Sequence, residues 1–338
     1  MRKLITLMIV GSIAWVFSPD AGAATAPAKI VIAHAAMNAR VAPLWVAQDR
    51  GFFAKNGITA STIFIRQAPV LVAALTAGDV QIGYTGGTSA LAAVAGGADL
   101  KIIATLTNRL GYDLVAGPTI KTAKDLRGKR IGVQSLGGTV WMGAMLGLEH
   151  LGLDPVRDNI TFLVIGDQTV LAQAVESGQV DATVLDGVFS RRLKQKGLTI
   201  LAELQQANIP FSSQGLIVKG SYLHEHGETL DQVFKGLMEA IAFTLAPQHK
   251  GSVIETIMQR LKLSDPKVAE EGYQDVIRGV EKKPYPTVEG LRNIQRLMKL
   301  RSPSVEKVKV EEMIDDRILR RLDQSGFIDR IYAAQGLK

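Results

Sequence analysis

Two short loops have residues whose types suit the binding of a small molecule. Gly86-Gly87-Thr88 and Gly137-Gly138-Thr139 each place Gly-Gly-Thr immediately before an apolar stretch. Glycine has no side chain, so a ligand can approach the backbone closely at these positions. Each threonine could hydrogen-bond the ligand or cap the helix that follows. The two loops together predict contacts with a ligand, and both roles of the threonines stay open.

Sequence patterns typical of enzymes are missing from the chain. It contains no Gly-x-Ser-x-Gly, no phosphate-binding loop with Gly-Lys-Ser/Thr and no His-Glu-x-x-His. It also has no cysteine, which excludes disulfides, thiol nucleophiles and thiolate metal ligands. His224 and His226 flank Glu225, but this spacing makes a weak metal site. We therefore predict no catalytic residue, no metal and no cofactor.

The loops belong to a larger unit that occurs twice. AGDVQIGYTGGT at 77–88 returns as SGQVDATVLDGV at 177–188, and the β-rich stretch at 29–34 returns at 130–135. In both copies the order is strand, loop, helix, strand, helix, strand. Strands that alternate with helices pair in parallel through right-handed crossovers. The repeat therefore predicts two α/β lobes, each with a mostly parallel sheet flanked by helices.

Ligands of open parallel sheets bind at the carboxyl ends of the strands, beside helix N-termini that offer free N–H groups. Four loops have this position, two in each lobe, at 34–40, 84–89, 135–139 and 186–190. We predict ligand contacts from residues of these four loops and from one residue of the second crossing between the lobes: His34, Asn38, Arg40, Thr85, Gly86, Gly87, Thr88, Ser135, Gly137, Gly138, Thr139, Asp186 and Gln214.

Several of these residues have a second, purely structural interpretation. His34 ends the first strand and is either a structural residue or a ligand contact. Arg40 could pair with an anionic group or lie exposed. Asp186 could accept a hydrogen bond from a ligand amine or hydroxyl, or cap the next helix. Gln214 could touch both the hinge and the ligand.

The chain order divides the sequence into three parts. Residues 1–23 form a predicted signal peptide. Residues 24–117 and 210–338 form the first lobe, and residues 118–209 form an inserted second lobe, so that two hinge segments connect the lobes. The helices predicted after the second crossing cover the first lobe: 230–246, 251–261, 266–279, 288–300 and 305–322.

The N-terminal segment predicts export. A short basic start precedes an apolar run at 4–17 that is too short for a comfortable membrane span, and Ala21-Gly22-Ala23 supplies a cleavage site after Ala23. The net charge of +7 comes from charges of both signs mixed along the chain, which is typical of solvated faces. With export and no cysteine, these features predict a soluble periplasmic protein that does not bind nucleic acid.

The same stretches resemble a known family. The similarity is carried by 42–58 (APLWVAQDRGFFAKNGI), 75–91, 121–139, 171–189 and 216–223, which cover most of residues 29–250. They resemble the periplasmic binding proteins of ABC importers for nitrate, sulfonates, taurine and related solutes, including binders of thiamine-pyrimidine precursors. The resemblance implies the two-lobed periplasmic binding protein fold (type II). It also implies a monomer that captures one small solute and delivers it to a membrane permease.

The resemblance leaves the solute open. An anionic or a heteroaromatic solute fits the family, although the chain has an aspartate and a histidine where an anion binder could prefer arginine. A yeast pyrimidine-synthesising member uses a cysteine-rich motif, and that chemistry is excluded here because the chain has no cysteine. Two alternatives keep the fold: a ligand-sensing protein that partners a membrane sensor, and a periplasmic enzyme.

Overall fold

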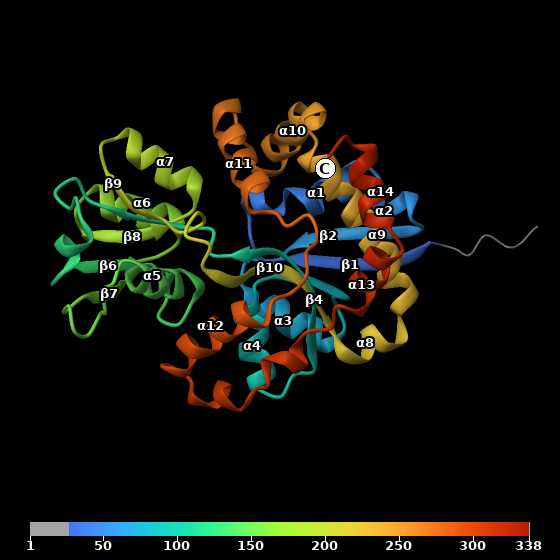
Figure 1. The fold of residues 1–338 in the computed structure, drawn as a ribbon, viewed down its shortest axis with the longest axis horizontal. Coiled ribbons are helices and arrows are strands. Elements are labelled where there is room, and N and C mark those ends of the chain that lie inside the picture. Colours follow the sequence, from blue (N-terminus) through green and yellow to red (C-terminus); the bar gives the residue numbers. More distant parts are fainter. Residues whose placement is uncertain (1–26, 338) are drawn as a thin grey trace, which may run out of the picture.

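The computed structural model describes residues 27–337, which form two α/β lobes lying side by side (Figure 1). The predicted signal peptide lies outside the described residues. The first lobe has the strand order β2-β1-β3-β10-β4 and the second has β7-β6-β8-β5-β9. In each sheet the first three strands are parallel and the fourth is antiparallel to them. This arrangement confirms the predicted fold class.

The two sheets are built from short strands. The first sheet consists of β1 Ala28–His34, β2 Ile58–Phe64, β3 Ile82–Thr85, β4 Leu100–Arg109 and β10 Pro210–Lys219. The second consists of β5 Asp113–Ala116, β6 Arg130–Val133, β7 Thr161–Val164, β8 Ala182–Leu185 and β9 Thr199–Glu203.

The two repeated units of the sequence fold into the same order of strands and helices. The helices of the two units are α1 Ala42–Asp49, α2 Phe52–Lys55, α3 Ala68–Ala77 and α4 Gly87–Ala95 in the first, and α5 Thr139–His150, α6 Gln168–Glu176 and α7 Gly187–Gln195 in the second. Gly78 and Gly178 end α3 and α6 with φ of 94° and 76°, a left-handed conformation that glycine adopts without strain. In the first unit the helical stretch after β1 is divided into α1 and α2, because Gly51 has φ of 72°.

The chain crosses between the lobes at 110–112 and at 204–209. The two crossings are joined by backbone hydrogen bonds from Leu110 N to Ile209 O and from Leu204 N to Tyr112 O, both 3.0 Å long. The predicted first boundary, after residue 117, is too late: β5 pairs with β8 and β9 and so belongs to the second sheet. The reason is that the partners of a strand are distant in sequence and leave no local pattern.

The C-terminal part is mainly helical. Its helices are α8 Gly220–Glu225, α9 Gly227–Leu245, α10 Lys250–Leu261, α11 Pro266–Gly279, α12 Val288–Lys299, α13 Arg317–Gln324 and α14 Phe327–Ala334. None of the helices in the described range is long and apolar enough to span a bilayer. The predicted helix at 305–322 is wrong, because two 3-10 turns precede α13 and Ile314 pairs with Ile102 of β4.

These helices do more than cover the first lobe. One face of the first sheet carries α1 and α9, and the other carries α3, α4 and α12 (Figure 1). The helix α11 also contacts α7, and α12 contacts α5, so both reach the second lobe. One apolar cluster continues from the second lobe through Leu110 and Phe211 to the α4 face of the first lobe. The two sheets are therefore separate, but apolar packing links the lobes.

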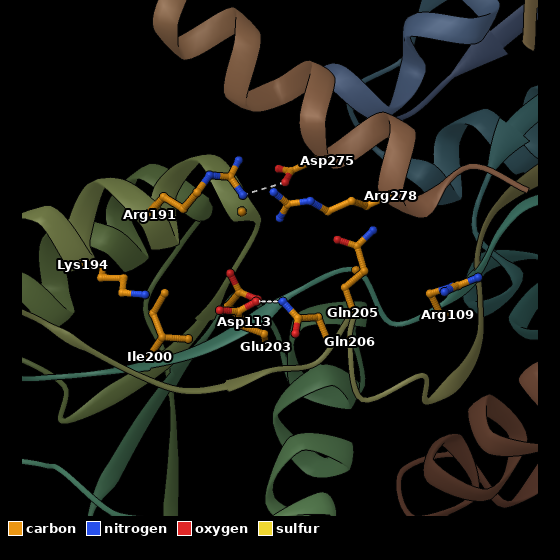
Figure 2. A pocket seen from close by; sticks show the side chains of 12 residues that line it. Arg109, Asp113, Arg191, Lys194, Ile200, Glu203, Gln205, Gln206, Asp275 and Arg278 are labelled. Carbon is orange, nitrogen blue, oxygen red and sulfur yellow. Dashed lines mark hydrogen bonds and ion pairs between the residues drawn. The ribbon is translucent and has the colours of Figure 1, made fainter. Parts of the chain in front are cut away.

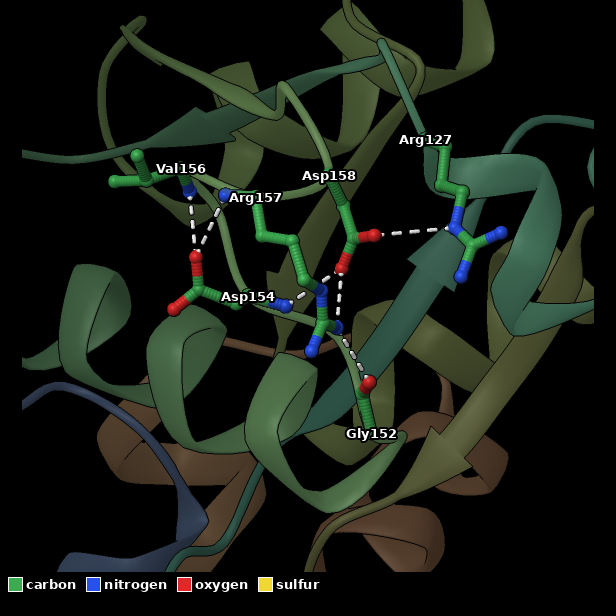
Figure 3. A network of polar contacts seen from close by, with 6 residues as sticks. All are labelled: Arg127, Gly152, Asp154, Val156, Arg157 and Asp158. Carbon is green, nitrogen blue, oxygen red and sulfur yellow. Dashed lines mark hydrogen bonds and ion pairs between the residues drawn. The ribbon is translucent and has the colours of Figure 1, made fainter.

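A polar network fixes the loop between α5 and β7 (Figure 3). Asp154 accepts hydrogen bonds from the backbone N–H groups of Val156 and Arg157 at 2.9 and 2.8 Å. Asp158 accepts from Arg157 at 2.6 Å and from Arg127 at 3.1 Å. The hydrogen bond from Arg157 is the main cause that lowers the pKa of Asp158 to about 2. This loop precedes β7, at the opposite end of the strand from the predicted ligand loops, so the network has a structural role.

Candidate functional site

The two predicted ligand loops of the first lobe both reach across to other parts of the molecule. The Arg40 guanidinium donates to the carbonyl oxygen of Gly111 in the first crossing and lies 5.0 Å from the centre of the Tyr112 ring. Thr88, in the first turn of α4, donates a hydrogen bond to Sδ of Met142 in α5 at 3.8 Å. The loops after β1 and β3 therefore meet the hinge and the second lobe.

The two predicted ligand loops of the second lobe lie against residues of the first lobe. A Cβ added at Gly137 would lie 3.7 Å from Cγ of Arg301, which follows α12. A Cβ added at Gly187 would lie 2.5 Å from both carboxylate oxygens of Asp275 in α11. The glycines thus allow the loops after β6 and β8 to pack against the first lobe. Each of the four loops therefore lies at the boundary between the lobes, which we call the lobe junction.

The threonines of the two Gly-Gly-Thr loops do not cap helices. The N-cap residues of α4 and α5 are Gly86 and Gly138, and neither helix has a side-chain cap. The capping interpretation of Thr88 and Thr139 is therefore wrong, and both side chains are half-buried beside uncapped N–H groups. Ser135 is exposed, and its hydroxyl folds towards Gly138.

His34 has the environment of a structural residue. Its ring is buried between Trp45 and Phe64, with centroid distances of 5.8 and 5.5 Å. Its Nδ1 donates to the carbonyl oxygen of Ala36 at 2.8 Å, because a carbonyl can only accept. Burial is the main cause that lowers the pKa of His34, so the neutral ring is favoured. The histidine orients the start of the first loop.

Asn38 and Arg40 give that loop its shape. Asn38 accepts a hydrogen bond from Arg40 N at 3.2 Å and caps the 3-10 turn Ala39–Val41. The Tyr84 hydroxyl donates to the carbonyl oxygen of Arg40 at 3.1 Å. The backbone and the guanidinium of Arg40 are both hydrogen-bonded, so the residue is fixed against the first crossing. The alternative that Arg40 lies freely exposed is therefore not what the structure has.

Thr85 and Gln214 lie buried in the first sheet beside the second crossing. Thr85 ends β3 and pairs with Gly215 of β10, while Gln214 lies opposite Thr107 of β4. The next two glycines, Gly86 and Gly87, pack against the start of β10: their added Cβ atoms would lie 2.9 Å from Ser213 O and 2.8 Å from the Ser212 side chain. The loop after β3 is therefore tightly positioned by β10.

Asp186 is the N-cap residue of α7; the Phe189 N–H in the first turn favours the charged form of its carboxyl, but no well-aligned cap hydrogen bond forms. Only 9% of the residue is exposed, and its Oδ1 has no hydrogen-bond partner. Burial raises the pKa of Asp186, and the nearby Arg40 charge opposes this effect. The structure therefore places an unsatisfied carboxylate oxygen at the lobe junction.

The junction contains a cavity of about 340 Å³ that is lined mainly by charged side chains and by Gly187, the residue after Asp186 (Figure 2). Arg191 of α7 donates to Asp275 Oδ1 at 2.7 Å and to the carbonyl oxygen of Glu271 at 3.0 Å. Ser190 donates to Asp113, whose pKa rises to about 6 mainly through burial. The sequence analysis missed this group, because Arg191 and Asp275 are 84 positions apart and neither belongs to a motif.

Exposed apolar side chains flank the junction at equivalent positions of the two units. Phe64 and Val164 end the edge strands β2 and β7, while Val70 and Val170 are the third residues of α3 and α6. Their exposed fractions are 42%, 60%, 51% and 40%. These four side chains and three further exposed apolar ones form a set that we call the apolar rim: Met37, Ile63, Phe64, Val70, Leu136, Val164 and Val170.

Within residues 27–337, no group of three or more His, Cys, Asp or Glu side chains could hold a metal ion. The groups present at the junction are helix N-termini, glycine-lined loops, Arg40 and Asp186. Such groups can hold and orient a small polar molecule between two lobes.

Comparisons with known proteins identify relatives of the chain. The family model described as NMT1/THI5 like matches residues 38–250, more than half of the chain. A Brucella abortus sequence described as a binding protein is 31% identical over 140 residues, which are 40% of this chain and 41% of that protein. The Escherichia coli taurine-binding periplasmic protein is 27% identical over 203 residues, 59% of this chain and 62% of the relative. The chain thus matches less than two thirds of either relative's length.

Solved structures show the same fold. The periplasmic aliphatic sulphonate binding protein SsuA from Escherichia coli superimposes with a TM-score of 0.69 at 20% identity, covering 87% of this chain and 99% of that one. At this identity the likeness concerns the fold alone.

Proposed function

Because the chain belongs to the NMT1/THI5-like family, we propose that it is the solute-binding component of an ABC importer in the periplasm. In this role it captures a small solute between its lobes and delivers it to a membrane permease. The proposal agrees with the resemblance found in the sequence and with the names of the relatives, one of which is a taurine-binding periplasmic protein.

The observation that carries the proposal is the position of all four loops at the lobe junction. Each loop follows the carboxyl end of a parallel strand, and each contacts the other lobe or the first crossing through Arg40, Thr88, Gly137 or Gly187. A solute bound there touches both lobes at once. Binding therefore favours the closed arrangement over the open one, which is the differential contact that a closing protein needs.

The predicted solute is small and either anionic or heteroaromatic. The uncapped N-termini of α4 and α5 support an anionic group, because their free N–H groups and helix dipoles favour negative charge. Arg40 adds a positive charge near the same junction. These groups can bind and orient an anionic solute at the junction.

A thermal-shift screen of the mature protein tests this proposal. The protein is unfolded and refolded to remove any bound solute, then melted with sulfonates, nitrate, small carboxylates and pyrimidines. We expect one class to raise Tm, because a ligand that binds only the folded state stabilises it. If none of these compounds raises Tm, a bacterial periplasmic extract is tested as a source of the solute. An extract that also leaves Tm unchanged would count against a solute-binding role.

Two variants test the site itself. Thr139→Trp and Thr88→Trp fill the space beside the uncapped helices, so we expect loss of the ligand-induced shift with little change in the Tm of the free protein. Thr59→Trp is the matched control, since Thr59 is exposed on β2 near the opposite end of that strand. Unchanged affinity in both junction variants would contradict the site.

A further inference from the structure

Asp186 carries a buried oxygen atom that no group among residues 27–337 satisfies. In the described part of the chain, four buried side-chain atoms lack a hydrogen-bond partner, and Asp186 Oδ1 is the only carboxylate oxygen among them. An unpaired buried acceptor costs free energy, and a charged one costs more than a neutral one. The folded protein therefore keeps an unfavourable group at the junction of its lobes.

The turn that holds Asp186 is fixed on both sides. Asp186 N donates to Oε1 of Gln168 at 2.9 Å, and Nε2 of Gln168 donates to the carbonyl oxygen of Val184 at 3.3 Å. On the other side, Gly187 packs directly against Asp275 and Arg191. A movement of the turn that brought the carboxylate to another donor would break these contacts.

The cations nearest to Asp186 are occupied elsewhere. Arg40 is bound to Gly111 and lies over Tyr112, and Arg191 is bound to Asp275 and Glu271. Neither forms an ion pair with Asp186 within the described residues. Both charges and the backbone N–H of Phe189 favour the ionised carboxylate, whereas burial and the charge of Asp275 oppose it. Among the described residues, Oδ1 itself still has no hydrogen-bond partner.

We propose that Asp186 receives an N–H group of the solute, so that the solute carries an amino group or another N–H donor as well as any anionic part. This inference rests on the proposed function and specifies its substrate class. A donor from the solute would satisfy Oδ1, and a solute without one would leave the oxygen unpaired. Sites with an unpaired polar group discriminate strongly against such analogues.

The test compares solutes that differ by an amino group. Three pairs cover the candidate classes: 2-aminoethanesulfonate with ethanesulfonate, β-alanine with propanoate, and 4-aminopyrimidine with pyrimidine. Isothermal titration calorimetry at pH 7 gives Kd for each. In the pair that binds, we expect the amino compound to bind at least tenfold more tightly to the wild-type protein.

Variants show whether Asp186 causes that preference. Asp186→Asn keeps the shape of the side chain and removes its charge, so we expect the preference to fall at least tenfold while the fold remains. Asp186→Ser is a second variant in case the amide disturbs the turn. Asp167→Asn is the control: Asp167 is exposed at the N-terminus of α6, and we expect the preference to stay unchanged.

The outcomes separate the two proposals. Equal affinity for both members of a binding pair, or an undiminished preference in Asp186→Asn and Asp186→Ser, overturns the role of Asp186 and leaves the solute-binding function in place. If no pair and no compound of the wider screen binds, the proposed function fails and the role of Asp186 fails with it.

Discussion

Arg191 Nη1 lies 2.7 Å from Asp275 Oδ1, and this ion pair joins α7 of the second lobe to α11 of the first. The side chain of Asp275 is 9% exposed and that of Arg191 is 25% exposed, so the pair is largely shielded from water. A second ion pair between the lobes, Arg296 with Glu149, has the same 2.7 Å distance but exposures of 51% and 58%. The two pairs therefore differ in burial and hardly in geometry.

We expect Arg191→Ala to lower the free energy of unfolding by about 1–3 kcal/mol, because it leaves Asp275 buried without its partner. Arg296→Ala is the matched control and should cost no more than ~1 kcal/mol, as exposed pairs do. Urea denaturation measures both. Equal losses for the two variants would show that burial does not strengthen the α7–α11 contact.

The raised pKa of Asp113 predicts a pH dependence. The unfolded carboxyl titrates near 3.8 and the folded one at about 6, so the folded state binds more protons between these values. The contribution of Asp113 to stability therefore falls as pH rises from about 4 to about 6, by at most ~1.4 kcal/mol per pH unit, and stays low above pH 6.

Asp113→Asn removes this titration. Urea denaturation at pH 4.5, 5.5 and 6.5 should show a wild-type stability, relative to the variant, that declines with pH. A difference that is constant or rises over this range would contradict the assignment. Ser190 donates to Asp113 and can donate equally to the amide oxygen of the variant, so the packing is preserved.

Gly87 should tolerate no side chain. A Cβ at this position would lie 2.8 Å from Leu291 and from Ser212, so Gly87→Ala should cost about 1–3 kcal/mol. Gly251 is the control, since it lies at the start of α10 with nothing within 4 Å of an added Cβ. Thermal melts should show Gly251→Ala unchanged or slightly more stable, and equal losses for both variants would contradict the packing argument.

Export can be tested directly on the full chain. Expressed in a bacterium, the protein should accumulate in the periplasm with Ala24 as its first residue, because the apolar run at 4–17 and Ala21-Gly22-Ala23 specify cleavage there. Mass spectrometry of the periplasmic fraction measures the N-terminus. A chain that stays in the membrane with residues 1–23 attached would contradict the signal peptide.

Local patterns in the sequence were enough to predict most of the fold. The repeated strands and helices, and the glycines that end α3 and α6, are specified by residues close together in the chain. Pro266 begins α11 as predicted, and Thr287 caps α12 by accepting from Gly290 N at 3.4 Å. Trp45 lies in the core because α1 is buried on all sides from residue 42 to residue 47.

Features that depend on distant partners could not be predicted in the same way. The strand β5 looks like any other strand, and only its pairing with β8 and β9 places it in the second lobe. The stretch at 305–322 has helical periodicity, yet Ile314 pairs with Ile102. The position of Asp186 after β8 predicts a site residue, but whether a donor reaches its Oδ1 depends on residues that are distant in the chain.

The apolar rim has a thermodynamic consequence. These side chains are exposed in the structure, and four of them form pairs one hundred residues apart, Phe64 with Val164 and Val70 with Val170. A closure that hides them removes hydrocarbon from water, and this lowers the heat capacity. Solute capture should therefore release more heat at 35 °C than at 15 °C, even when the solute itself is wholly polar.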